Sequence, residues 1–156
     1  MGRDWSSHNK KIVENKLRKS TESIEERITK VLTMVAQEIV LYIEGARQIP
    51  VYTGNLQDST GVGVYRNGVL RSYMPTQTAT VAQEYAYRPI WGTEELAKAL
   101  NVGATEFSKG IWIVLFSAVP YAWFIDDKYN FFEDGVAKEL LNTFYSYMKT
   151  EFPNSI

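Results

Sequence analysis

The residues that could carry out chemistry in this chain are few and scattered. The only histidine is His8, which lies in a polar N-terminal segment, and there is no cysteine. Nucleophilic catalysis of the serine–histidine or cysteine–histidine type therefore lacks a credible base, and a zinc site lacks ligands. Asp126 and Asp127, with Glu133 and Asp134 nearby, could bind a divalent cation. Because such loop carboxylates more often stay hydrated or cap a helix, we expect no metal and no cofactor.

One enzyme hypothesis remains. Glu84 could pair with one of these loop carboxylates as the acid and base of a glycosidase, although nothing in the spacing supports it. No glycine-rich phosphate loop is present, since Gly61-Val-Gly63 fits a strand with small residues. By elimination, we expect a structural or binding protein and not an enzyme.

The charge is uneven along the 156 residues, although the formal net charge is −1. Residues 1–19 carry a local net charge of +4, and residues 120–156 one of −3. We predict a flexible basic arm over residues 1–19. It could pair through Lys16, Arg18 and Lys19 with the acidic end of a neighbouring subunit, or touch nucleic acid, or simply remain solvated. No apolar run reaches the ~18 residues of a membrane span, so we expect a soluble intracellular product without membrane contact.

A long helix must carry the first part of the core. Apolar residues recur at three- and four-residue steps from Ile24 to Ala46, which predicts a helix over about residues 20–46. Ser23 and Glu26 have capping-box spacing, and Pro50 forbids continuation. A second amphipathic helix is predicted near the C-terminus, with apolar positions at 132, 136, 140, 144 and 148.

Strand patterns fill the middle of the chain. Residues 61–65 and 69–73 flank Asn67-Gly68, which predicts a tight hairpin. Thr93 is expected to cap a short helix from Glu94 to about Leu100 that ends near Gly103. Residues 110–119 are apolar throughout, which predicts a strand in the middle of the sheet. The predicted fold class is α+β: a long N-terminal helix and a C-terminal helix pack on a small, mainly antiparallel sheet. It forms one domain over 20–152, followed by a tail over 153–156.

Two segments resemble a known family. Pro50-Val-Tyr-Thr53-Gly54-Asn55-Leu56-Gln-Asp58-Ser59 is similar to the P-x-x-T-G-N-L-x-x-S signature of the gene-product-ten type neck and tail-completion family of long-tailed phages. Val119-Pro120-Tyr121-Ala122 resembles that family's second marker, PYA. The runs 65–80 and 108–122 resemble members from phages and prophages of Bacteroides-like hosts. The likeness covers about residues 20–150, but Asp126 and Asp127 stand where many members carry Glu and Gly.

The resemblance implies a structural virion protein at the head–tail junction, made in the host cytoplasm. It would form a ring of its own copies and contact other neck, head-closure and tail-tube proteins. The alternatives are a minor capsid or tail-tube-associated protein, or a cytosolic binding module or small hydrolase of a mobile element. The motif either shapes a helix-to-strand corner or, with Tyr52 and Asn55 exposed, touches a neighbouring subunit. The candidate interface residues are Lys16, Arg18, Lys19, Tyr52, Thr53, Gly54, Asn55, Trp91, Tyr121, Trp123, Asp126 and Asp127.

Overall fold

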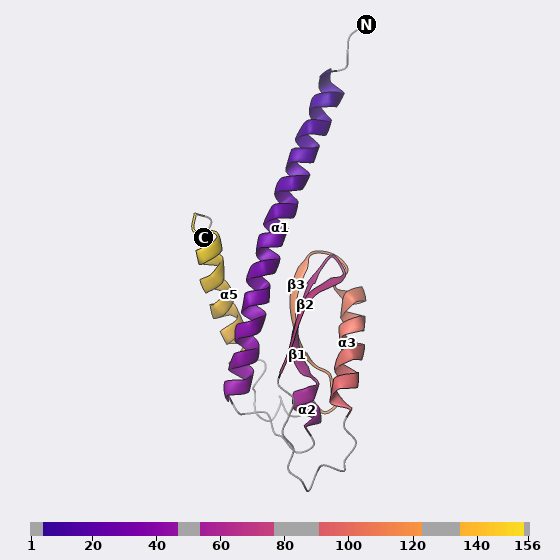
Figure 1. Cartoon of the computed structure of the whole chain (residues 1–156), viewed down its shortest axis with the longest axis vertical. Helices are drawn as coiled ribbons and strands as arrows, with labels where there is room; N and C mark the ends of the chain where they lie inside the picture. Colours follow the sequence, from indigo (N-terminus) through magenta and orange to yellow (C-terminus); the bar gives the residue numbers. More distant parts are fainter. Residues whose placement is uncertain (1–4, 47–53, 77–90, 123–134, 155–156) are drawn as a thin grey trace.

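The computed structural model describes residues 5–46, 54–76, 91–122 and 135–154 (Figure 1). The elements are α1 (Trp5–Ala46), α2 (Asn55–Asp58), β1 (Thr60–Arg66), β2 (Val69–Pro75), α3 (Gly92–Glu106), β3 (Ile111–Ser117) and α5 (Ala137–Glu151). The three strands form an antiparallel sheet in the order β2-β1-β3. Helix α1 covers one face, α3 covers the other, and α5 runs beside α1 (Figure 1). The predicted α+β class is confirmed.

Helix α1 ends at Ala46, as predicted, but it begins at Trp5 and not near residue 20. Ser23 and Glu26 therefore lie in mid-helix, and the predicted capping box is wrong. The physical reason is that no glycine or proline interrupts residues 5–44, and the lysine, arginine and glutamate there are good helix formers. The division of the chain at residue 20 does not match an end of a helix, and the mobility of residues 1–19 stays a prediction.

The main core lies between α1, the sheet and α5. The apolar stripe of α1 supplies Val31, Val35, Ile39 and Ile43, each at most 2% exposed. Strand β1 contributes its buried valines, and buried Val136 lies at the N-cap of α5. Helix α5 itself adds four partly buried side chains: Leu140, Phe144, Tyr147 and Met148. Both amphipathic patterns read from the sequence therefore face the same core, as a one-sided apolar stripe requires.

Strand β1, and not β3, is the central strand of the described sheet. Val62 and Val64 of β1 pack with α1, while Tyr65 points to the α3 side beside Phe107 and Phe116. Strand β3 pairs with β1 alone among the described strands, so its predicted central position is not found within the described part of the sheet. Its continuous apolar character arises because α1 and α3 partly cover its two faces, although one strand edge has no described strand against it.

The predicted hairpin is confirmed. Asn67 has a φ of 51° and Gly68 a φ of 76°, the positive angles that a type I′ turn needs. The turn is also tied to the start of β3. Asn67 N–H donates to Gly110 O at 2.8 Å, and Gly110 N–H donates to Asn67 Oδ1 at 3.0 Å. The hairpin end is thereby held against the strand that follows α3.

Helix α3 is longer than predicted and runs through Gly103 to Glu106. Gly103 does not end the helix; it makes room for Tyr65, whose Oη would lie 2.6 Å from a Cβ added at Gly103. The same hydroxyl donates to Leu100 O at 2.9 Å. Burial raises the pKa of Tyr65. Thr93 does not act as the cap, because the helix already begins at Gly92.

Candidate interaction surfaces

The cap of α3 comes from the Thr-Gly-Asn-Leu segment. Gly54, with a φ of 79°, turns the chain so that Asn55 begins the short helix α2. Asn55 Oδ1 accepts the backbone N–H groups of Trp91 at 2.8 Å and Gly92 at 3.0 Å. Those donors lie at the N-terminus of α3, where no intrahelical partner exists. A Cβ on Gly92 would clash with Asn55 O, so glycine is required at that contact.

The two segments that carry the family resemblance meet at this corner. Leu56 packs with Val119 and Ala122 in a small second core, and Trp91 lies against it. Leu56 O accepts hydrogen bonds from the hydroxyl groups of Ser59 at 2.9 Å and Thr60 at 2.7 Å. These two polar side chains therefore find their hydrogen-bond partner within the corner itself. The corner is a folded unit built from both segments.

Asn55 is only 3% exposed, so its predicted exposure is wrong. The physical reason is its capping role, which takes the side chain into the space between α2 and α3. The geometry therefore favours the alternative that the motif shapes a helix-to-strand corner. The outer surface of the corner is aromatic: Trp91 and Tyr121 stack edge to face at 6.4 Å, and Tyr121 is 38% exposed.

The predicted interface residues separate into two places. Gly54, Asn55, Trp91 and Tyr121 gather at the corner. The basic residues 16, 18 and 19 lie on the part of α1 that points away from it (Figure 1). Five of the predicted residues lie outside the described part of the chain: Tyr52, Thr53, Trp123, Asp126 and Asp127. The enzyme candidate Glu84 and the carboxylates 133 and 134 also lie outside it.

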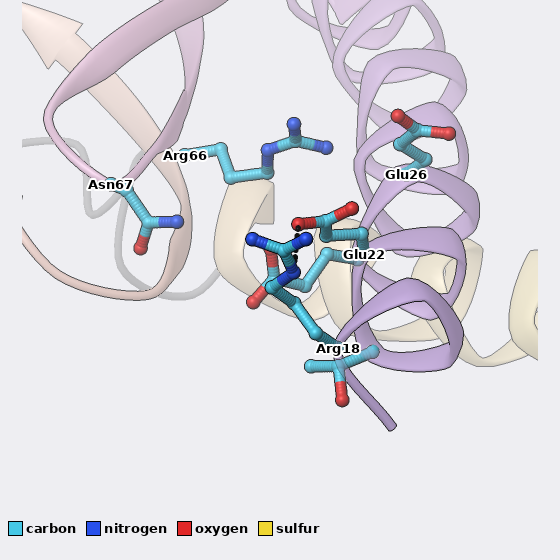
Figure 2. A pocket seen from close by; sticks show the side chains of 7 residues that line it. Arg18, Glu22, Glu26, Arg66 and Asn67 are labelled. Atoms are coloured by element: carbon cyan, nitrogen blue, oxygen red, sulfur yellow. Dashed lines mark ion pairs between the residues drawn. The ribbon is translucent and has the colours of Figure 1, made fainter. Parts of the chain in front are cut away.

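A groove of about 540 Å³ lies between residues 18–26 of α1 and the hairpin turn. It is lined by Arg18, Thr21, Glu22, Glu25, Glu26, Arg66 and Asn67. Figure 2 shows Arg66 extending from the hairpin toward the glutamates of α1. Arg18 and Glu22 form an exposed ion pair of 3.9 Å. Such pairs contribute little to stability, and the groove holds charges of both signs without an enclosed reactive group.

Exposed apolar side chains on α1 were not identified as candidates from the sequence. On the N-terminal part, Ile12, Val13 and Leu17 are 41%, 55% and 62% exposed; toward the C-terminal end, Leu41 is 60% and Tyr42 37% exposed. The signal was available, because Leu17, Ile24 and Val31 are spaced by seven and extend the core stripe beyond residue 20.

In the part of the chain that the structure describes, no three His, Asp or Glu side chains come close enough to hold a metal ion. The pKa of Tyr147 is raised by partial burial and then by Glu38, whose Oε1 accepts a hydrogen bond from its hydroxyl at 3.3 Å. No helix of the described residues is long and apolar enough to cross a membrane.

Comparisons with known proteins gave no relative. No family model, no curated protein and no solved structure matched the chain.

Proposed function

We propose that this chain is a structural subunit of the head–tail junction of a long-tailed phage, a neck or tail-completion component that assembles as a ring. The observation that supports it most is the corner where the two family-like segments meet. Asn55 of the first segment caps α3, and Leu56 packs on Val119 and Ala122 of the second. Two markers that depend on each other in one folded unit are less easily explained by chance than two unconnected matches.

The shape of α1 agrees with a part that acts by assembly. A helix of 42 residues extends well beyond the sheet and α5 (Figure 1). Its N-terminal part exposes apolar side chains. Burying them in a contact with another subunit would be favourable. A ring requires a heterologous interface, in which one face of a subunit meets a different face of the next. A projecting helix supplies one such face.

The test is an early stop codon in this gene of the encoding phage, with imaging of the lysate by electron microscopy. We expect separate DNA-filled heads and tails, or tails of abnormal length, and normal virions when the full chain is supplied from a plasmid. Normal virions without the protein would overturn the proposal. Turnover by the purified protein that is lost in Glu84→Gln or Asp126→Asn would instead establish the hydrolase.

A further inference from the structure

The N-terminal part of α1 carries an apolar stripe that no other described element covers. Within the fold, Ile28, Val31 and Val35 of this stripe are partly or fully buried. Val13 and Leu17 continue it at helical spacing and are more than half exposed. They belong to the N-terminal part of α1, and that part of the helix extends beyond the sheet and α5 (Figure 1). The same stripe is therefore packed inside the fold toward the C-terminal end of α1 and faces solvent toward its N-terminal end. From here on, the arm means residues 9–19 of α1, which form part of the basic segment over residues 1–19.

The charges of α1 oppose its helix dipole. The arm holds five basic residues and one acidic residue, whereas residues 31–46 hold Glu38 and Glu44 and no basic residue. The first turn has no acidic residue and the last turn no basic one. Because a helix favours acids at its N-terminus and bases at its C-terminus, this distribution does not serve the stability of the helix itself. Because the charges depart from the helix-dipole preference, we infer that they serve a purpose other than the stability of α1.

A surface that complements the arm exists on the same chain. Near the other end of α1, exposed Leu41 and Tyr42 lie beside Glu38, three and four residues earlier on the same side of the helix. Glu38 is held in place by the hydroxyl of Tyr147 on α5. This surface, which we call the acceptor face, pairs apolar side chains with negative charge, as the arm pairs apolar side chains with positive charge.

The two surfaces cannot meet within one molecule. Leu17 and Leu41 stand on one continuous helix, ~36 Å apart along its axis at 1.5 Å per residue. They can meet only between two copies, and such a contact is heterologous because the arm of one copy meets a different surface of the next.

We propose that the arm of one copy docks on the acceptor face of a second copy, with Val13 and Leu17 covering Leu41 and Tyr42. In this contact Lys16 of the arm faces the partner's Glu38. The proposal rests on the proposed ring and gives it a heterologous contact, by which each subunit both donates an arm and accepts one.

Nucleic acid is a less suitable occupant for the arm. The apolar stripe at Val13 and Leu17 has no role in phosphate binding, which uses cationic side chains. Glu22, Glu25 and Glu26 follow the arm on the same helix and would repel a phosphate backbone.

The first test uses the absence of cysteine in the natural chain. We would mix the full-length Leu17→Cys and Leu41→Cys variants under mild oxidation and separate the products on a non-reducing gel. The proposal predicts a disulfide-linked heterodimer. The matched control replaces Leu17→Cys by Asn15→Cys, which is exposed on the opposite side of the arm. Equal yields from the two pairs, or no heterodimer at the highest soluble concentration, would overturn the proposal.

The second test exchanges charge between the surfaces. Lys16→Glu with Lys19→Glu should weaken self-association, and so should Glu38→Lys, each measured by mass photometry at low salt. Mixing the two variants should restore association, because each copy then finds a complementary surface on the other. Leu17→Asp should weaken association by about tenfold to a hundredfold, as loss of one buried leucine would, and Val102→Asp, on exposed α3 surface, should not.

Two outcomes separate this proposal from the proposed function. Mixed variants that fail to associate, while virions lacking the protein still show unjoined heads and tails, would overturn the arm contact and leave the junction role standing. An arm that retards duplex DNA in a gel shift, with self-association unchanged by Leu17→Asp, would show nucleic acid to be the occupant and overturn the contact as well.

Discussion

Asn55→Ala is the substitution whose cost follows most directly from the structure. It removes the oxygen that accepts the N–H groups of Trp91 and Gly92 at the start of α3. Loss of a helix cap costs about 1 kcal/mol, which we assign to the part-buried Trp91 N–H. The buried Gly92 N–H, left without an acceptor, adds about 1–3 kcal/mol. The free energy of unfolding should therefore fall by about 2–4 kcal/mol.

For a domain of this size that loss lowers the melting temperature by about 5–15 °C. Urea denaturation followed by circular dichroism measures it, with the midpoint falling at an unchanged slope. Asn55→Asp keeps an acceptor at the helix N-terminus and should lose less than Asn55→Ala. Asn101→Ala makes the same replacement at an exposed site on α3 and should be near neutral. A midpoint for Asn55→Ala equal to the wild-type value would refute the capping role and, with it, our account of the motif.

Two other changes test packing and charge. Gly103→Ala should destabilise the fold although alanine favours helices, because its Cβ would lie 2.6 Å from Tyr65 Oη; Tyr65→Phe should recover part of that loss in a double-mutant cycle, and Gly45→Ala, in open space, should be neutral or stabilising. The hydrogen bond from Arg27 lowers the pKa of Glu151 below its ordinary value of 4.5. Its contribution to stability is therefore present above pH 4.5 and lost as the pH falls through the lowered pKa, so Arg27→Gln should flatten the acid limb of the stability–pH curve; an unchanged limb would contradict this assignment.

The sequence predicted the elements whose signals are local. The end of α1 follows from its apolar period and from Gly45 and Pro50, and the hairpin follows from Asn67 and Gly68. The start of α1 was misplaced because the apolar stripe thins out before residue 20, although nothing in the chain stops the helix there. Helix propensity and the absence of a breaker decided the outcome.

The sequence favoured β3 over β1 as the central strand of the described sheet, because part of the packing around β1 does not come from its own apolar side chains. In β1 the α3 side carries Gly61 and Gly63, and rings from neighbouring strands fill the space: Tyr73 over the first and Phe116 over the second. Two glycines under aromatic rings are buried as fully as two valines, yet they make the strand look less apolar than β3. Only the pairing of distant segments reveals this.

The candidate site divides in the same way. The turn chemistry of Gly54 and the corner role of the motif could be predicted from residue types. The capping of Trp91 and Gly92 by Asn55 could not, because it joins residues 36 and 37 positions apart. The exposed arm could have been found, since Leu17 and Ile24 continue the heptad spacing of the core stripe.

A map of the head–tail junction in purified virions, obtained by electron cryomicroscopy, would show whether this chain forms a ring there. We expect a ring in which each subunit contributes a single continuous helix of ~63 Å, the length of 42 helical residues, with its N-terminal end against the neighbouring subunit. A junction whose density is fully explained by other chains, in virions that do not contain this protein, would contradict it.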